Sequence, residues 1–289
     1  MLTYFIDSDC DFNLEDCARL GARLISMPYS VDGKTIYPYE DFKTYDVKAF
    51  YDSLRAGTLP TTSAVTTEKY IEYFESEFAA GNDIFYLHFS EAMSMTFGNM
   101  RAAVKTLQEK YPERKFYELD TKGITIVSYL IGQNFFKLVR EGKTPEELLA
   151  WGEKEIPHYA QYFFADDLKF FRRSGRVGGL AATMGGLIGL RPIIYMSAEG
   201  KMESIGTEKG RAKAVARLLN EVQEKGLDVK EHGIVVGHTD SPAVAQEVAD
   251  KLREIYGPDL DLVIIPTNPT AGAHCGPNGV GVAFHSKCR

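Results

Sequence analysis

The stretch Asp83 to Thr96, DIFYLHFSEAMSMT, decides the fold of this chain, because a buried strand in it runs directly into a turn rich in hydroxyl groups. Ile84 to Phe89 is a short, largely apolar run, which predicts a central parallel strand covered on both faces. Ser94 and Thr96 precede the predicted helix Phe97 to Lys110, and either hydroxyl could cap it. A strand end that faces a helix N-terminus also favours an anion such as a carboxylate or phosphate, because free N–H groups and the positive end of the helix dipole meet there.

A second hydroxyl cluster precedes another predicted helix, about thirty residues earlier in the chain. Thr62 and Ser63 end the loop LPTTS (59–63), and a helix capped by Thr66 or Thr67 is predicted over 68–80. In a βαβ arrangement the loops that follow successive parallel strands lie at the same edge of the sheet. We therefore expect the two hydroxyl clusters to converge and form a polar pocket.

Length, charge and cysteine content exclude several classes of protein. A chain of 289 residues is long enough for two modest domains. The net charge of −7 leaves no basic field for nucleic acid. The four cysteines show no C-x-x-C spacing, so we expect neither a zinc site nor a redox pair, and reduced thiols favour a cytoplasmic location. The N-terminus does not resemble an export signal, and no run of about 18 apolar residues predicts a transmembrane segment.

Strands and helices alternate in the first half of the chain, which predicts a parallel, doubly wound sheet over residues 1–157. Asp7, Asp9 and Asp11 alternate after the first strand, but Phe12 replaces the glycine that a calcium loop requires, so we interpret them as a strand-end turn that could border a site. The predicted strands are 2–6, 23–31, 84–89 and 116–119, and the predicted helices are 14–20, 46–56, 68–80, 97–110, 124–138 and 145–156.

Residues 158–289 predict a second, α+β domain, so the fold class is α/β with two domains and a ligand between them. The segment GGLAATMGGLIGL (178–190) predicts a slim helix that either packs closely or leaves room for a long apolar ligand; it is not a dinucleotide fingerprint, because no strand precedes it. The predicted strands are 159–164, 191–195, 202–206, 233–237, 262–265 and 280–284, the helices are 215–226 and 243–255, and 272–279 is a loop.

Four segments, taken in order along nearly the whole chain, resemble the DegV family of bacterial fatty-acid-binding proteins, which serve as the lipid-presenting subunit of fatty acid kinase. The Thr-Ser pair of the family matches Thr62-Ser63, and its Ser-Gly-Thr turn matches Ser94-Met95-Thr96. Its Gly-Arg segment matches Gly175-Arg176, and the Lys-Pro pair that follows matches Arg191-Pro192. Its His-Thr-Gly-Pro loop matches His274-Cys275-Gly276-Pro277. Met95 replaces a glycine of the family pattern, and Cys275 replaces a threonine.

The resemblance implies a non-catalytic, cytoplasmic, lipid-binding protein with no cofactor. It implies that the carboxylate of a long-chain fatty acid is held by the hydroxyls of Thr62 and Ser94 and by the N–H of Met95, with the acyl tail between the two domains. Ser63 and Thr96 would also belong to the ligand-binding site, and Arg176, Arg191 and His274 would lie near its opening. A separate fatty acid kinase would phosphorylate the presented head group from ATP, and transient contact with a membrane surface is compatible with this role.

Two alternatives remain open. Ser94 could be the nucleophile of a hydrolase or acyltransferase with His274 as its base, although the small flanking residues of a nucleophile elbow are missing. Arg172, Arg173 and Arg176 could bind phosphate or a nucleotide, although the sequence lacks a P-loop.

Overall fold

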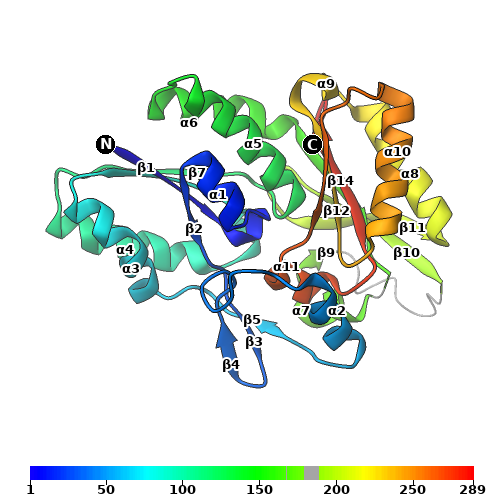
Figure 1. The fold of residues 1–289 in the computed structure, drawn as a ribbon, viewed down its shortest axis with the longest axis horizontal. Helices are drawn as coiled ribbons and strands as arrows, with labels where there is room; N and C mark the ends of the chain where they lie inside the picture. Colours follow the sequence, from blue (N-terminus) through cyan, green and yellow to red (C-terminus); the bar gives the residue numbers. More distant parts are fainter. Residues whose placement is uncertain (167, 179–188) are drawn as a thin grey trace.

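The computed structural model describes residues 1–166, 168–178 and 189–289. In this part of the chain the strands form sheets of four, seven and three strands. The two larger sheets lie on either side of helix α5 (Ile126–Arg140), which packs against both of them (Figure 1). The α/β class, with a parallel sheet first and a mixed sheet second, is confirmed.

The four-stranded sheet is entirely parallel, as the sequence predicts. Its order is β2-β1-β6-β7, formed by Ala22–Ile25, Leu2–Asp7, Asp83–His88 and Phe116–Asp120. Phe5 packs against Phe74 of α3 (Thr67–Ala79), whereas its neighbour Tyr4 packs against Phe135 of α5, with ring centroids 5.2 and 6.1 Å apart. Because neighbouring residues of a strand point to opposite faces, α3 and α5 cover opposite faces of the sheet.

The remaining helices of this half follow the predicted pattern. α4 (Thr96–Lys110) lies beside α3, while α1 (Leu14–Leu20) and α6 (Pro145–Glu155) lie on the side of α5 (Figure 1). Asn13, Thr66 and Thr144 cap α1, α3 and α6 through their side chains, as expected from their hydroxyl and amide groups. Two short 3₁₀ turns follow strand ends, η1 (Ser8–Cys10) after β1 and η2 (Glu91–Met93) after β6.

The single strand predicted over 23–31 is wrong. The chain forms β2 and then β3 (Tyr29–Val31), which belongs to the three-stranded sheet with β4 (Lys34–Ile36) and β5 (Thr61–Thr62). The run breaks because the Met27 N–H donates to the Ser8 hydroxyl and Pro28 has no N–H to donate to a ladder. This small antiparallel sheet fixes Thr62 opposite Tyr29.

The seven-stranded sheet is mixed and has the order β13-β12-β14-β8-β10-β11-β9. Helices α8 (Arg211–Lys225) and α10 (Pro242–Tyr256) cover the face turned away from α5 (Figure 1). On the inner face, Gly237 admits Ile126 of α5, since a Cβ at this glycine would collide with that side chain, and a Cβ at Gly281 would lie 3.1 Å from it. The strands β8 to β14 are Tyr159–Phe164, Val177–Gly178, Leu190–Met196, Met202–Lys209, Ile234–His238, Leu262–Pro266 and Val280–His285.

Helix α11 (Pro269–Cys275) replaces the first part of the loop predicted over 272–279. Its start carries a regular capping signal, because the Asn268 side chain accepts a hydrogen bond from the Ala271 N–H and Pro269 occupies the first turn. The short helices α2 (Val47–Arg55), α7 (Lys169–Ser174) and α9 (Val229–His232) and the turn η3 (Ile156–His158) complete the described elements.

The four-stranded sheet precedes residue 157 and the seven-stranded sheet follows it, while the boundary between domains 1–157 and 158–289 stays a prediction. Most of the slim helix expected over 178–190 lies outside the described residues. Within those residues, no helix is both long and apolar enough to cross a bilayer.

Candidate functional site

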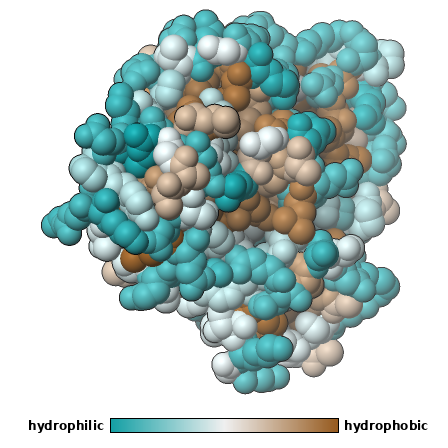
Figure 2. Space-filling view, turned by 60° about the vertical axis from the view of Figure 1, so that its left-hand side comes forward, coloured by the Kyte–Doolittle hydropathy of each residue, from teal (hydrophilic) through white to brown (hydrophobic). Residues whose placement is uncertain are grey.

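A cavity of about 260 Å³ lies between the two large sheets, where strand ends, α5 and α11 meet. This volume is close to the lower end of the roughly 300–1,000 Å³ usual for small-molecule sites. In Figure 2, apolar surface gathers near the middle of the face shown, within a rim of hydrophilic residues. Most of the cavity wall is apolar, and its larger apolar side chains are Met27, Phe89, Met93, Met95, Ile124, Ile126, Phe163, Phe164, Phe171, Met202 and Val280.

The hydroxyl cluster of Thr62 and Ser63 reaches the cavity, and a contact between residues far apart in the sequence fixes it there. Thr62 and Ser63 both line the cavity, and Oγ1 of Thr62 lies 2.9 Å from Nε2 of His274. β5 holds Thr62 in place, and α11 holds His274. α11 is itself fixed by the Thr270 hydroxyl, which donates to the Met27 carbonyl at 2.7 Å.

The hydroxyl turn at Ser94 lines the same cavity through Ser94 and Met95. The expectation that Ser94 or Thr96 occupies the cap position of α4 is wrong, because the residue there is Met95 and its side chain makes no capping bond. The Ser94 hydroxyl instead accepts the Thr96 N–H at 3.2 Å. No hydrogen bond among the described residues uses the Met95 N–H, and the Met95 side chain is 89% exposed. A free N–H at a helix start and a half-buried hydroxyl therefore lie together at the cavity.

Thr96 does not line the cavity but ties the two hydroxyl loops together. Its buried Oγ1 accepts the N–H of Val65 at 3.1 Å and lies 3.0 Å from the Tyr70 hydroxyl. Val65 follows the Thr62 loop in sequence, whereas Thr96 follows Ser94. This bond holds the two loops together, so they converge as the sequence predicts, although Thr62 lies in β5 of the small antiparallel sheet and not after a parallel strand.

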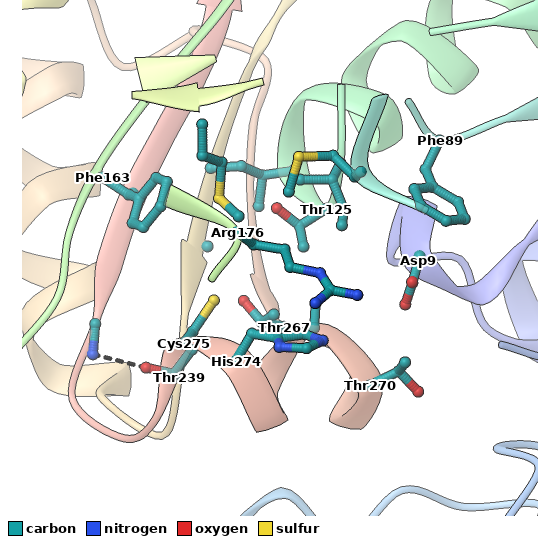
Figure 3. Close-up of a pocket in the computed structure, with 18 of the residues that line it drawn as sticks. Asp9, Phe89, Thr125, Phe163, Arg176, Thr239, Thr267, Thr270, His274 and Cys275 are labelled. Carbon is teal, nitrogen blue, oxygen red and sulfur yellow. Dashed lines mark hydrogen bonds between the residues drawn. The ribbon is translucent and has the colours of Figure 1, made fainter. Parts of the chain in front are cut away.

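The arginines expected at the opening differ in their surroundings. Arg176 lines the cavity, and Figure 3 shows its guanidinium extending between His274 and Asp9. Arg191 does not line the cavity, because its guanidinium pairs with the Asp166 carboxylate. Whether any of the eight expected residues contacts a ligand stays a prediction.

Burial and the neighbouring cations Arg176 and Arg173 lower the pKa of His274 to about 4. The imidazole is therefore neutral at neutral pH. One of its ring nitrogens can donate a hydrogen bond while the other accepts, so the Thr62 hydroxyl can point its own proton toward the cavity or toward the ring. The charge at this end of the cavity comes from arginine, which favours an anionic group.

The sequence analysis did not single out several polar residues of the cavity. Thr239 and Thr267 follow the carboxyl ends of the parallel pair β12 and β13, so the rule that singled out Thr62 and Ser94 would have found them too. Thr125 and Gln161 carry no sequence signal. Asp9 does, since it belongs to the acidic strand-end turn, and it lines the cavity with 6% of its surface exposed.

A family model described as an uncharacterised protein of the DegV family matches residues 3–287. A DegV domain-containing protein of Clostridium perfringens is 31% identical over 237 residues, which are 82% of this chain and 81% of that protein.

Two solved structures share the fold over almost their entire length. One is a stearic-acid-binding protein from Eubacterium ventriosum, 19% identical, with a TM-score of 0.87 and 99% of both chains covered. The other is a DegV family protein from Eubacterium eligens loaded with heptadecanoic acid, 20% identical, with a TM-score of 0.84 and coverage of 99% of this chain and 100% of that one.

Proposed function

Since the chain belongs to the DegV family, we propose that it binds one long-chain fatty acid in the cavity between its two large sheets. The carboxylate would accept hydrogen bonds from the hydroxyls of Thr62 and Ser94 and from the N–H of Met95. The acyl tail would lie along the apolar wall. The observation that carries this proposal is that both hydroxyl clusters line one cavity whose remaining wall is mostly apolar.

The two parts of such a ligand would contribute differently to binding. Burying each methylene is worth about 0.8 kcal/mol, so a dozen contribute roughly 10 kcal/mol before the losses of association. Hydrogen bonds to a charged group add about 1.5–3 kcal/mol each, and an unpaired buried carboxylate is costly. The tail therefore supplies the affinity, and the head contacts select acids over alcohols and fix the orientation.

A carboxylate suits the polar end for three physical reasons. The hydroxyls of Thr62 and Ser94 donate, the start of α4 presents an N–H that no described residue uses, and Arg176 adds a positive charge. His274 stays neutral, so it orients Thr62 without adding charge.

The same contacts oppose a hydrolase that uses Ser94 as nucleophile. Nε2 of His274 faces Thr62, and the Ser94 hydroxyl accepts the Thr96 N–H. No described residue accepts the Ser94 proton as a base would. We therefore propose a binding protein without catalytic residues; sustained, Ser94-dependent turnover of a generic ester would contradict this.

Mass spectrometry of the lipid extracted from the purified protein tests the binding proposal. We expect about one fatty acid per chain, lost in the double variant Thr62→Ala, Ser94→Ala and retained in Thr106→Ala, whose exposed hydroxyl bonds only to its own helix. Unchanged lipid content in the double variant would remove both hydroxyls from the site. Lipid-free wild-type protein that also fails to bind added stearic acid would contradict fatty acid binding altogether.

We further propose that the protein presents its ligand to a separate fatty acid kinase. In support, Ser63 and Met95 are exposed where the hydroxyl loops line the cavity, so the head group would lie near the surface. Incubating the loaded protein with ATP and a purified fatty acid kinase, and trapping the product with hydroxylamine, should yield an acyl hydroxamate. Product formed equally well from free fatty acid without this protein would contradict the presenting role.

A further inference from the structure

The cavity contains a buried carboxyl group that the proposed head-group contacts do not use. Asp9 is 6% exposed, lines the cavity, and no described residue donates a hydrogen bond to its Oδ1. Asp7 accepts from the N–H groups of Cys10 and Phe89. Asp11 accepts from Asn268 through Oδ1 only, and its buried Oδ2 also has no described partner, but Asp11 does not line the cavity. A buried polar atom without a partner is destabilising, so its place in a ligand cavity points to a partner on the ligand.

Thr125 adds a second polar group next to Asp9. Its N–H donates to the Asp9 carbonyl at 2.6 Å, and its hydroxyl lines the cavity. That hydroxyl accepts from the Gln161 amide at 3.4 Å but donates to no described residue. Thr125 also has a positive φ of 57°, a backbone conformation that is costly for a β-branched residue and that recurs at functional sites.

The cavity wall near Asp9 and Thr125 is mostly apolar, apart from the Arg176 guanidinium. Ile124 and Ile126, the sequence neighbours of Thr125, line the cavity. Phe89 also lines it, and Figure 3 shows Phe89 beside Asp9. In that view Asp9 lies on the opposite side of the Arg176 guanidinium from Cys275, and its carboxyl group is directed into the cavity. A plain hydrocarbon tail passing here would leave the Asp9 oxygen and the Thr125 proton unpaired.

We propose that the preferred ligand is a long-chain fatty acid with a hydroxyl group on its chain, and that this hydroxyl donates to Asp9. The inference rests on the proposed fatty acid binding and narrows it to a substrate class. A hydroxyl fits because its proton can be donated to the unpaired Asp9 oxygen, while its lone pairs can accept from another donor of the cavity. Asp9 would thus be a specificity-determining residue within the cavity.

The charge state of Asp9 argues against a cationic ligand group. Burial, together with the neighbouring Asp7 and Asp11, raises the pKa of Asp9 well above its usual range, which favours the neutral carboxyl group over the carboxylate. A neutral carboxyl group attracts an ammonium group too weakly to offset the desolvation of that cation. Its oxygen needs a donor and its proton needs an acceptor; a ligand hydroxyl supplies both, whereas a keto oxygen supplies only an acceptor.

Competition binding on the full, delipidated chain tests the proposal with stearic acid and a set of its monohydroxylated forms that differ in the position of the hydroxyl. We expect wild-type protein to bind at least one hydroxylated form about tenfold more tightly than stearic acid, the factor that one hydrogen bond of this kind provides. Asp9→Leu, which keeps the branched shape, should reverse the preference. Asp9→Asn, which keeps an acceptor oxygen, should retain most of it.

The outcomes separate this inference from the function on which it rests. The role of Asp9 would be overturned if the wild type bound stearic acid and every hydroxylated form with equal affinity. It would also be overturned if Asp9→Leu kept the preference of the wild type. Either result would leave fatty acid binding intact. Binding of none of the acids would overturn both. Affinity for stearic acid is measured in each variant. Asp9→Leu should bind stearic acid at least as well as the wild type does, and this binding also shows that the variant is folded.

Discussion

Nε2 of His274 lies 2.9 Å from Oγ1 of Thr62, a contact between residues 212 positions apart. It joins β5 of the small sheet to α11, and both residues line the cavity between the two large sheets. The polar end of the candidate site therefore exists only when the N-terminal and C-terminal parts of the chain are folded against each other. Ligand binding and the docking of these parts should be thermodynamically linked.

Replacing Thr62 by Val should weaken the binding of stearic acid about tenfold or more, because it removes one hydrogen bond to a charged group worth about 1.5–3 kcal/mol. Displacement of a fluorescent fatty acid measures the change. Thr61→Val is the matched control, since Thr61 is the exposed neighbour in β5 and does not line the cavity. Equal losses in the two variants would show that the strand, and not the Thr62 hydroxyl, matters.

Arg176→Gln should lower the affinity for fatty acids, and Arg191→Gln should leave it nearly unchanged. Arg176 lines the cavity, whereas Arg191 lies outside it and pairs with Asp166. The effect of Arg176 should be about three- to tenfold and should shrink at high salt, because its side chain is exposed to screening. Titrations at low and high ionic strength measure it. A larger loss in Arg191→Gln than in Arg176→Gln would reverse the assignment of the two residues.

His274 should make the folded protein less stable as the pH falls. Its pKa is lowered to about 4 in the folded protein, mainly by burial, against about 6.5 in an unfolded chain. Between these values the unfolded state binds more protons, so the contribution of His274 to stability is lost on acidification by up to about 1.4 kcal/mol per pH unit. Urea unfolding of the wild type and of His274→Gln, from pH 7 to pH 4.5, measures this slope.

The comparison with His274→Gln is necessary because other groups titrate in the same range. Burial raises the pKa of Asp11 to about 7, and a raised carboxyl pKa acts with the opposite sign, stabilising the folded state as the pH falls. The difference between wild type and variant isolates His274. Parallel pH profiles for the two proteins would contradict the lowered pKa.

Thr96→Val should destabilise the protein by about 1–3 kcal/mol, because it leaves the buried N–H of Val65 without an acceptor. Urea unfolding monitored by the fluorescence of Trp151, the single tryptophan, measures the loss. Thr106→Val is the control in the same helix, since its exposed hydroxyl only bonds back to the Ala102 carbonyl. If both variants lost the same stability, helix propensity and not the bond between the loops would be responsible.

Local signals in the sequence predicted most of the secondary structure. The strand within Ile84–Phe89, the caps Asn13, Thr66 and Thr144, and the alternation that makes the first sheet parallel are all present. The failures also have local causes. Pro28 and the Met27–Ser8 bond split one predicted strand into two, and the Asn268 cap with Pro269 starts a helix where a loop was expected.

The sequence by itself determined the parallel strands of the first sheet, the capped helices that follow them and the hydroxyl turn at Ser94, because strand period, helix caps and βαβ chirality are properties of short segments. It also predicted that the Thr62 loop lies near that turn, but Thr62 belongs to β5 of the small antiparallel sheet and does not follow a parallel strand. Only the tertiary structure decided that Thr62 meets His274, that Arg191 pairs with Asp166, and that Asp9 faces the same cavity. These relationships depend on how α5 packs between two sheets and how α11 returns to the first half of the chain. No local pattern encodes contacts between residues so far apart, because they form only when the whole core packs.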